Sequence, residues 1–338
     1  MRRIILSTFC LLLMSGSAFA QDTQLTETLE LLTWTAGVYP EQRDCFSCHH
    51  QTMPSLALKQ AHRQGLEVDL EEIERQIALT ARFFEPRIPR MLKGEGVPGK
   101  SFTAGYALWL FEDNQRPADK TTDAMVAYLR QRQQEDGHWR IGTKRPPIEY
   151  TDFTATALAV RGLRDYGRPL VKTQTSPETP ASSPLSDAER IAKAQQWLIA
   201  TPAKNQEART FKLLGLLWSD ADRAEIDKVV EEIIQQQRPE GGWSQEKEMQ
   251  SDAYATGQIL FALLKADAGK TYRDAIDRGI AWLKSTRLPD GSWFVQTRSK
   301  PIQTYFESGF PHDKSQFIST AATSWAALAI LLVEAEGQ

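Results

Sequence analysis

Two cysteines and a histidine near the start of the chain are the residues best suited to chemistry. Cys45, Cys48 and His49 form the sequence C-x-x-C-H. At this spacing two thiols can bond the vinyl groups of a haem while the following histidine ligates its iron. The motif therefore predicts covalent haem c with His49 as the iron ligand. A redox role would follow, with a redox partner protein.

Two other interpretations of the cysteine pair stay open. In an oxidising compartment the thiols can form a disulfide, although one that closes so short a ring is strained and easily reduced. The chain would then be a partner-binding module. A zinc site would need Cys45, Cys48, His49 and His50 together, but adjacent histidine side chains diverge and rarely reach one tetrahedral ion.

The first 20 residues determine which compartment these thiols meet. Residues 1–20 contain two arginines, an apolar run and small residues that end in an A-x-A sequence, which are the parts of a secretory signal. Cys10 lies within this segment and would be removed with it. We therefore expect a periplasmic or secreted protein whose mature chain, residues 21–338, is one domain.

Composition describes an ordinary globular chain. The sequence is 41% hydrophobic and 25% charged, with a net charge of −3. This charge gives no basic field for nucleic acid, so we expect no nucleic-acid partner. After the signal, the longest apolar run, Thr320–Val333, is shorter than the roughly 18 residues that span a bilayer. We expect no transmembrane segment in the mature chain.

A pattern that recurs about every 50 residues predicts the architecture. In its clearest copies a short polar residue is followed three positions later by alanine and then by an apolar helix. The leading residues are Thr52, Ser101, Asp152, Asn205, Asp252 and Ser319. All six are good N-cap types, so each is expected to begin an inner helix, with amphipathic outer helices between them. The expected fold is all-α, an (α/α)6 toroid of helical hairpins.

A second repeated element follows three of the expected outer helices. The segments Gln133–Trp139, Gln237–Trp243 and Arg287–Trp293 each carry an acidic residue and a glycine, with a tryptophan two positions later. The acid–glycine pair is typical of a turn, which the tryptophan can cover. These segments resemble the QW repeats of squalene–hopene and oxidosqualene cyclases, found in looser form in protein prenyltransferase β subunits. The resemblance covers about residues 25–334 and implies a terpenoid cyclase-like toroid.

The resemblance also implies a catalytic acid at Asp152. The cyclases protonate an isoprenoid with the middle aspartate of D-x-D-D-T-A, whereas residues 150–155 here read Y-T-D-F-T-A. Of the three aspartates only the middle one, Asp152, is retained, and without neighbouring carboxylates one main cause of a raised pKa is missing. Full triterpene cyclisation is therefore not expected. Asp152, and Asp252 in the equivalent slot, are each either an acid or a helix cap.

The repeat also predicts where these groups lie. Equivalent inner helices of a closed ring point the same way, so Asp152, Asp252 and the cysteine motif should share one mouth of the toroid. The aromatic-rich insertion Arg298–Phe317 should fold over that mouth, whereas the Pro/Ser/Thr-rich segment 171–186 should be an exposed loop. His62 and His138 are expected in solvent.

Aromatic residues at helical spacing suggest an alternative function. Tyr106, Trp109, Phe153, Tyr254 and Trp325 either pack the core or line an apolar cavity in the toroid. In the second case the chain would be an enzyme or binder that acts on an isoprenoid or another apolar small molecule.

Overall fold

The computed structural model describes residues 23–167 and 185–336. The predicted signal, residues 1–20, lies outside the described residues, as does most of the predicted loop 171–186. The described part of the chain is built from helices, with two isolated β-bridges in its loops.

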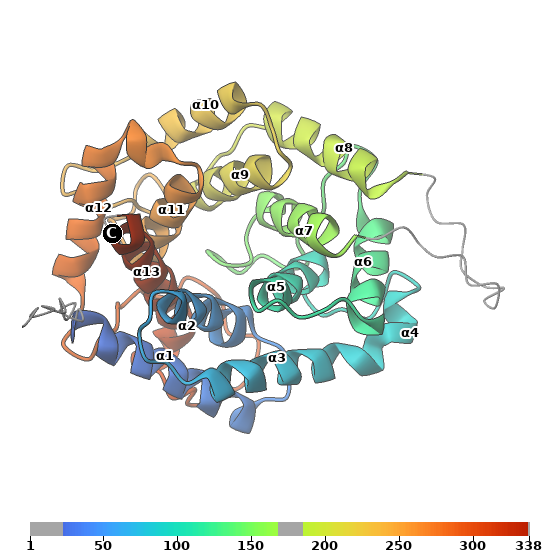
Figure 1. Cartoon of the computed structure of the whole chain (residues 1–338), viewed down its shortest axis with the longest axis horizontal. Coiled ribbons are helices and arrows are strands. Elements are labelled where there is room, and N and C mark those ends of the chain that lie inside the picture. The colour runs from blue at the N-terminus through green and yellow to red at the C-terminus, as the bar shows by residue number, and fades with distance from the viewer. Residues whose placement is uncertain (1–22, 168–184, 337–338) are drawn as a thin grey trace, which may run out of the picture.

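The helices form two concentric rings (Figure 1). Neighbouring inner helices contact one another all the way round, and the last contacts the first. The predicted (α/α)6 toroid is therefore confirmed. The inner ring consists of α2 (Met53–Arg63), α5 (Lys100–Asp113), α7 (Asp152–Tyr166), α9 (Gln206–Trp218), α11 (Ala253–Lys265) and α13 (Gln316–Glu336). The outer ring consists of α1 (Thr23–Gln42), α3 (Leu70–Phe84) with the short α4 (Ile88–Met91), α6 (Lys120–Arg132), α8 (Asp187–Ala200), α10 (Arg223–Ile234) and α12 (Arg273–Thr286).

Each inner helix begins within three residues of its predicted start, but only two of the six leading residues cap their helix with a side-chain hydrogen bond. Asn205 and Asp252 accept hydrogen bonds from the amides of Ala208 and Ala255, each at 2.9 Å. Both side chains satisfy an amide that the first helical turn leaves without a partner.

The other four leading residues do not cap their helices. Thr52 has helical backbone angles and makes no capping hydrogen bond, and Ser101 is the second residue of α5. Thr151, rather than Asp152, caps α7 with its hydroxyl. Ser319 lies inside α13, because the insertion before it ends in a 3-10 turn that continues into the helix at Gln316.

Small residues let the inner helices approach one another closely. A Cβ atom added to Gly257 would lie 2.6 Å from the backbone nitrogen of Ala326. Such a contact is impossible for a real side chain, so α11 and α13 approach closely only because residue 257 is glycine.

The three tryptophans of the repeated turns are buried, as expected. Trp139, Trp243 and Trp293 are 0%, 0% and 1% exposed. Each indole nitrogen donates to the carbonyl ten residues earlier, at 2.8, 2.9 and 2.9 Å. These carbonyls belong to α6, α10 and α12, so each ring ties the turn to the outer helix before it.

The residue that leads each turn fastens it to the next outer helix. Gln237 donates to the carbonyl of Gly241 within the turn and to that of Ala275 on α12. In the third turn the next outer helix is α1. There Arg287 donates to the Thr28 hydroxyl at 3.1 Å, and that hydroxyl donates to the Gly291 carbonyl at 2.6 Å. Arg287, which replaces the leading glutamine of the other two turns, thus joins the last turn to the first helix and closes the outer ring.

One helical stretch of the described chain, Asp313–Glu336, is long and apolar enough to cross a membrane. The sequence prediction counted only the shorter apolar run within it. However, 83% of the most apolar window is buried inside the protein, as expected for the core helix α13.

Candidate functional site

The cysteine motif lies at the end of the toroid where the inner helices begin. Cys48 opens a π-helix, Cys48–Thr52, that leads directly into α2. Ser47 caps this turn, because its hydroxyl accepts from the His50 amide while its own amide donates to Gln51 Oε1 at 2.7 Å. The cap fixes the motif against the start of the inner ring.

The two thiols are free and differ in exposure. Cys45 is half-buried and its Sγ lies 3.2 Å from the hydroxyl of Tyr39, whereas Cys48 is 8% exposed. Burial, reinforced by the Glu149 carboxylate, raises the pKa of the Cys48 thiol to about 12. Cys48 is therefore protonated at neutral pH.

Both histidines of the motif are neutral and pack against aromatic rings. Burial, followed by the charge of Arg145, lowers the pKa of His49 to about 3, and burial lowers the pKa of His50 well below its usual value. The two Nδ1 atoms lie 2.5 Å apart. The Phe317 ring centroid lies 5.3 Å from that of His49, and the Tyr39 ring stacks on His50 at 4.9 Å.

These contacts test whether the residues fit a haem. Two free thiols followed by a neutral histidine have the right chemistry. The packing is less suitable, because the rings of Phe317 and Tyr39 already lie beside His49, with centroids at 5.3 and 6.2 Å from its own. Over the described parts of the chain, no group of three or more His, Cys, Asp or Glu side chains is arranged to hold a metal ion.

Asp152 binds the loop before its helix. Its Oδ1 accepts from the Ile141 amide at 2.8 Å, and its Oδ2 lies 3.7 Å from His138 Nε2. The prediction of a solvated His138 is wrong. Its ring is 8% exposed, bonds Asp136 and stacks on Trp197 at 4.9 Å.

Asp252 caps α11 and is half-buried. Burial raises the pKa of its carboxyl to about 6, against the opposing hydrogen bond from the Ala255 amide. Its second oxygen, Oδ2, accepts no hydrogen bond from any residue that the structure describes.

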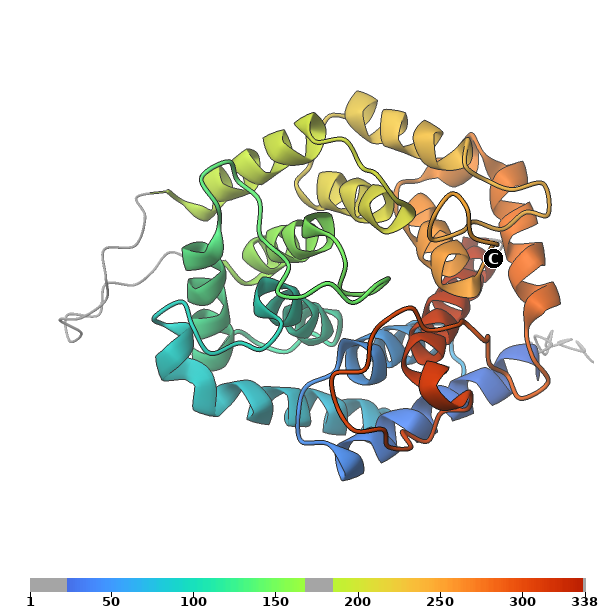
Figure 2. The same ribbon diagram turned by 180° about the vertical axis from the view of Figure 1, so that it is seen from behind.

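The two aspartates and the cysteine motif share one end of the toroid, as the register predicted. Loops cover this end. The hairpin that pairs Arg145 with Glu149 reaches toward the centre of the ring (Figure 2). The Ser299 hydroxyl donates to the Pro146 carbonyl, and Phe306 packs on Tyr39 at 5.8 Å. The insertion Arg298–Phe317 therefore folds over the mouth, also as predicted.

Glu207 is the buried acid that sequence reasoning missed. It is the second residue of α9 and is 4% exposed. Oε1 accepts from the Thr154 hydroxyl at 3.1 Å and Oε2 from the Tyr254 hydroxyl at 3.0 Å. Burial raises the pKa of this carboxyl to about 8, so it is mostly protonated at neutral pH. It borders a cavity of about 10 Å³, room for about one water.

The repeat contains the signal that could have revealed Glu207. Thr154, Glu207 and Tyr254 are each the third residue of their copies, counted from Asp152, Asn205 and Asp252. The side chains at this repeat position on three consecutive inner helices therefore meet at the Glu207 carboxyl.

A larger cavity opens at the opposite end, where the inner helices finish. Its volume is about 340 Å³. Arg63, Asp113, Trp218 and Lys265 line it, and each is the last residue of its inner helix. The cysteine motif and both aspartates lie at the other end of the toroid, away from this cavity.

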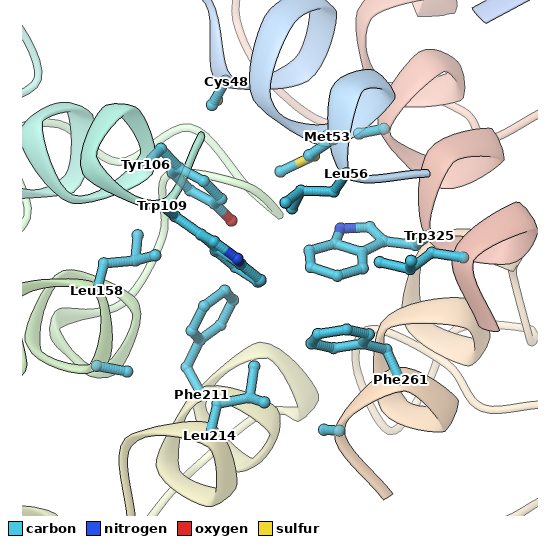
Figure 3. Close-up of a cluster of buried hydrophobic side chains, with 14 of the residues drawn as sticks. Cys48, Met53, Leu56, Tyr106, Trp109, Leu158, Phe211, Leu214, Phe261 and Trp325 are labelled. Carbon is cyan, nitrogen blue, oxygen red and sulfur yellow. The ribbon is translucent and has the colours of Figure 1, made fainter. Parts of the chain in front are cut away.

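Aromatic side chains form the apolar part of this cavity. Trp109, Phe261 and Trp218 line it, and Trp325 packs 6.0 Å from Trp109 and 5.2 Å from Phe261. Figure 3 shows Trp109, Phe261 and Trp325 turned toward the same central space from three helices. Of the other predicted lining residues, Phe153 packs on Trp197 and Tyr254 bonds Glu207.

Comparison with known proteins agrees with this architecture. The family model of the squalene–hopene cyclase C-terminal domain matches residues 183–337. A search of curated protein sequences gives no match.

Solved structures resemble nearly the whole chain. The type II terpene cyclase MstE from Scytonema is 13% identical, with a TM-score of 0.55, and the match covers 93% of this chain and 99% of MstE. A variant of MstE in complex with geranylgeranyl dihydroxybenzoate, its substrate, gives 14% identity, the same coverage and the same TM-score. A possible GH105 family member from Salmonella enterica is 11% identical, with a TM-score of 0.56, and the match covers 99% of this chain and 100% of the other. The chain therefore has a squalene–hopene cyclase-like helical toroid fold.

Proposed function

We propose that the toroid binds an elongated apolar molecule in the cavity at the carboxyl ends of its inner helices. The observation that carries the proposal is the cavity itself, about 340 Å³ in volume with walls of Trp109, Trp218 and Phe261. This volume falls within the roughly 300–1,000 Å³ of small-molecule sites, which are mostly lined by apolar and aromatic side chains.

An isoprenoid chain is the ligand class that we favour. The MstE variant resembles this chain in fold and was solved with a geranylgeranyl-bearing substrate. The apolar lining also includes Leu56, Leu217 and Leu328, whose branched side chains suit a methyl-branched hydrocarbon.

Binding, rather than cyclisation, is the activity that the geometry supports. Asp152 and Asp252 lie at the starts of α7 and α11, whereas the cavity lies at the ends of these helices. Neither carboxyl is placed to protonate a ligand there.

Filling the cavity should abolish binding. We expect farnesol to change the fluorescence of wild-type protein, because Trp109 and Trp218 line the cavity. Leu217→Trp should weaken its affinity at least tenfold, since the larger ring occupies the ligand's space. Leu92→Trp is the matched control, because Leu92 is 45% exposed and lies outside the cavity lining. Equal affinities for both variants and the wild type would contradict the proposal.

Covalent haem on Cys45 and Cys48 stays a prediction of the motif, as do the redox partner and the exported location. Protein produced in a host with cytochrome c maturation should then gain the mass of one haem. It should also keep a Soret band after acid–acetone extraction. A mass two protons below that of the dithiol would show a disulfide instead.

A further inference from the structure

The rim of the 340 Å³ cavity is rich in positive charge. Among its lining residues are Arg63, Arg161, Arg164 and Lys265, against one carboxylate, Asp113. Cations that line an apolar cavity disfavour a cationic ligand, even though its aromatic walls could otherwise hold one.

Two of the three arginines are held in position mainly by neighbouring carboxylates. Arg63 donates from both terminal nitrogens to Asp113 Oδ1, each at 3.1 Å. Arg164 pairs with Asp165 at 2.8 Å. Their charges are thus largely balanced within the protein.

Arg161 pairs with carboxylates and also lies over two aromatic rings. It pairs with Glu112 and lies 3.5 Å from Asp165, with its guanidinium 4.9 Å from the Trp109 ring and 5.0 Å from the Trp218 ring. Its Nε faces Asp165 Oδ2 at 3.5 Å and forms no shorter hydrogen bond with any described residue.

Lys265 is the one cation of the lining that forms no close ion pair with a described residue. Within the described ranges it forms no salt bridge, and its ammonium lies 5.7 Å from the centre of the Phe261 ring. With Asp113, Glu112 and Asp165 all counted against the four cations of the lining, one positive charge remains in excess. A lysine at the end of α11 also complements the helix dipole, but that role needs no aromatic cavity beside it.

We infer that the ligand of this cavity is amphipathic, with an anionic group at Lys265 and its apolar chain along Trp109 and Phe261. This inference rests on the proposed function and adds the chemistry of the head group to it. A carboxylate at the rim would neutralise the excess charge, and its apolar chain would remain against the aromatic walls. The ligand would enter from the end of the toroid opposite to the cysteine motif.

The test compares two probes that share one chain, farnesoic acid and farnesol, on the full mature protein at pH 7.5. Farnesoic acid should bind at least tenfold more tightly than farnesol. Lys265→Met should remove this difference and leave the affinity for farnesol unchanged. Lys228→Met, on the outer helix α10 and outside the cavity lining, should leave both affinities unchanged.

The outcomes separate the two proposals. If both probes bind equally and Lys265→Met has no effect, the anionic group is wrong and the apolar cavity stands. If neither probe binds, the proposed function fails and the inference fails with it. A loss of affinity for the acid that is equal in both lysine variants would show a general effect of charge and overturn the role of Lys265.

Discussion

Glu207→Gln should make the toroid markedly more stable at neutral and mildly alkaline pH. The pKa of this buried carboxyl is raised from an ordinary value of 4.5 to about 8. Between these two values the unfolded chain loses the proton and the folded chain keeps it. The free energy of unfolding therefore falls by about 1.4 kcal/mol for each pH unit in this window. The total fall amounts to roughly 4 kcal/mol at pH 7.5.

The amide of glutamine should keep the structural role of the neutral acid. It can still accept from the Thr154 hydroxyl, and its NH2 group can donate to the Tyr254 hydroxyl. It cannot ionise, so the stability lost between pH 4.5 and 8 in the wild type should be retained in the variant. Both proteins should still lose a smaller amount of stability as the pH rises toward about 6, because the pKa of Asp252 is raised to about 6.

Urea unfolding at pH 5, 6.5 and 8 measures this effect. The wild-type free energy of unfolding should fall steeply across the series, whereas that of Glu207→Gln should fall much less. Glu231→Gln is the control, because Glu231 is exposed on the outer helix α10. Parallel pH profiles for the wild type and Glu207→Gln would show that the buried carboxyl does not hold its proton.

The sequence predicted the rings better than the caps within them. Helix starts came from a repeat with a clear apolar period, and each was found within three residues. The individual caps were less certain because good capping residues occur side by side. Thr151 precedes Asp152 directly, and either type can satisfy a first-turn amide. Tertiary contact decided between them, since the Asp152 carboxylate binds the Ile141 amide instead.

The candidate site was predicted in part for a similar reason. Register placed the cysteine motif, Asp152 and Asp252 at one end, because equivalent helices of a ring point the same way. The carboxyl ends of the helices carry no shared motif. Arg63, Trp218 and Lys265 are unrelated residue types, so only the folded ring shows that they surround one cavity.

Trp243→Ala should destabilise the protein by about 3–5 kcal/mol, the usual range for the truncation of a fully buried tryptophan. Trp243 is 0% exposed. Its indole nitrogen donates to the Ile233 carbonyl at 2.9 Å, and its amide donates to the Thr256 hydroxyl at 2.9 Å. Loss of the ring would leave a cavity between α10 and α11 and take the indole donor away from the Ile233 carbonyl.

Two further variants separate these causes in urea unfolding. Trp243→Phe keeps most of the ring and loses the indole donor, so its cost should be closer to the 1–3 kcal/mol of an unmet buried polar group. Trp34→Ala is the control for loss of a tryptophan as such, because Trp34 is 64% exposed and should change stability by less than about 0.5 kcal/mol. If Trp243→Ala costs no more than Trp34→Ala, the repeated turns do not hold the outer ring to the inner one. A full loss already in Trp243→Phe would instead place the stabilisation in the hydrogen bond to Ile233 rather than in the packing of the ring.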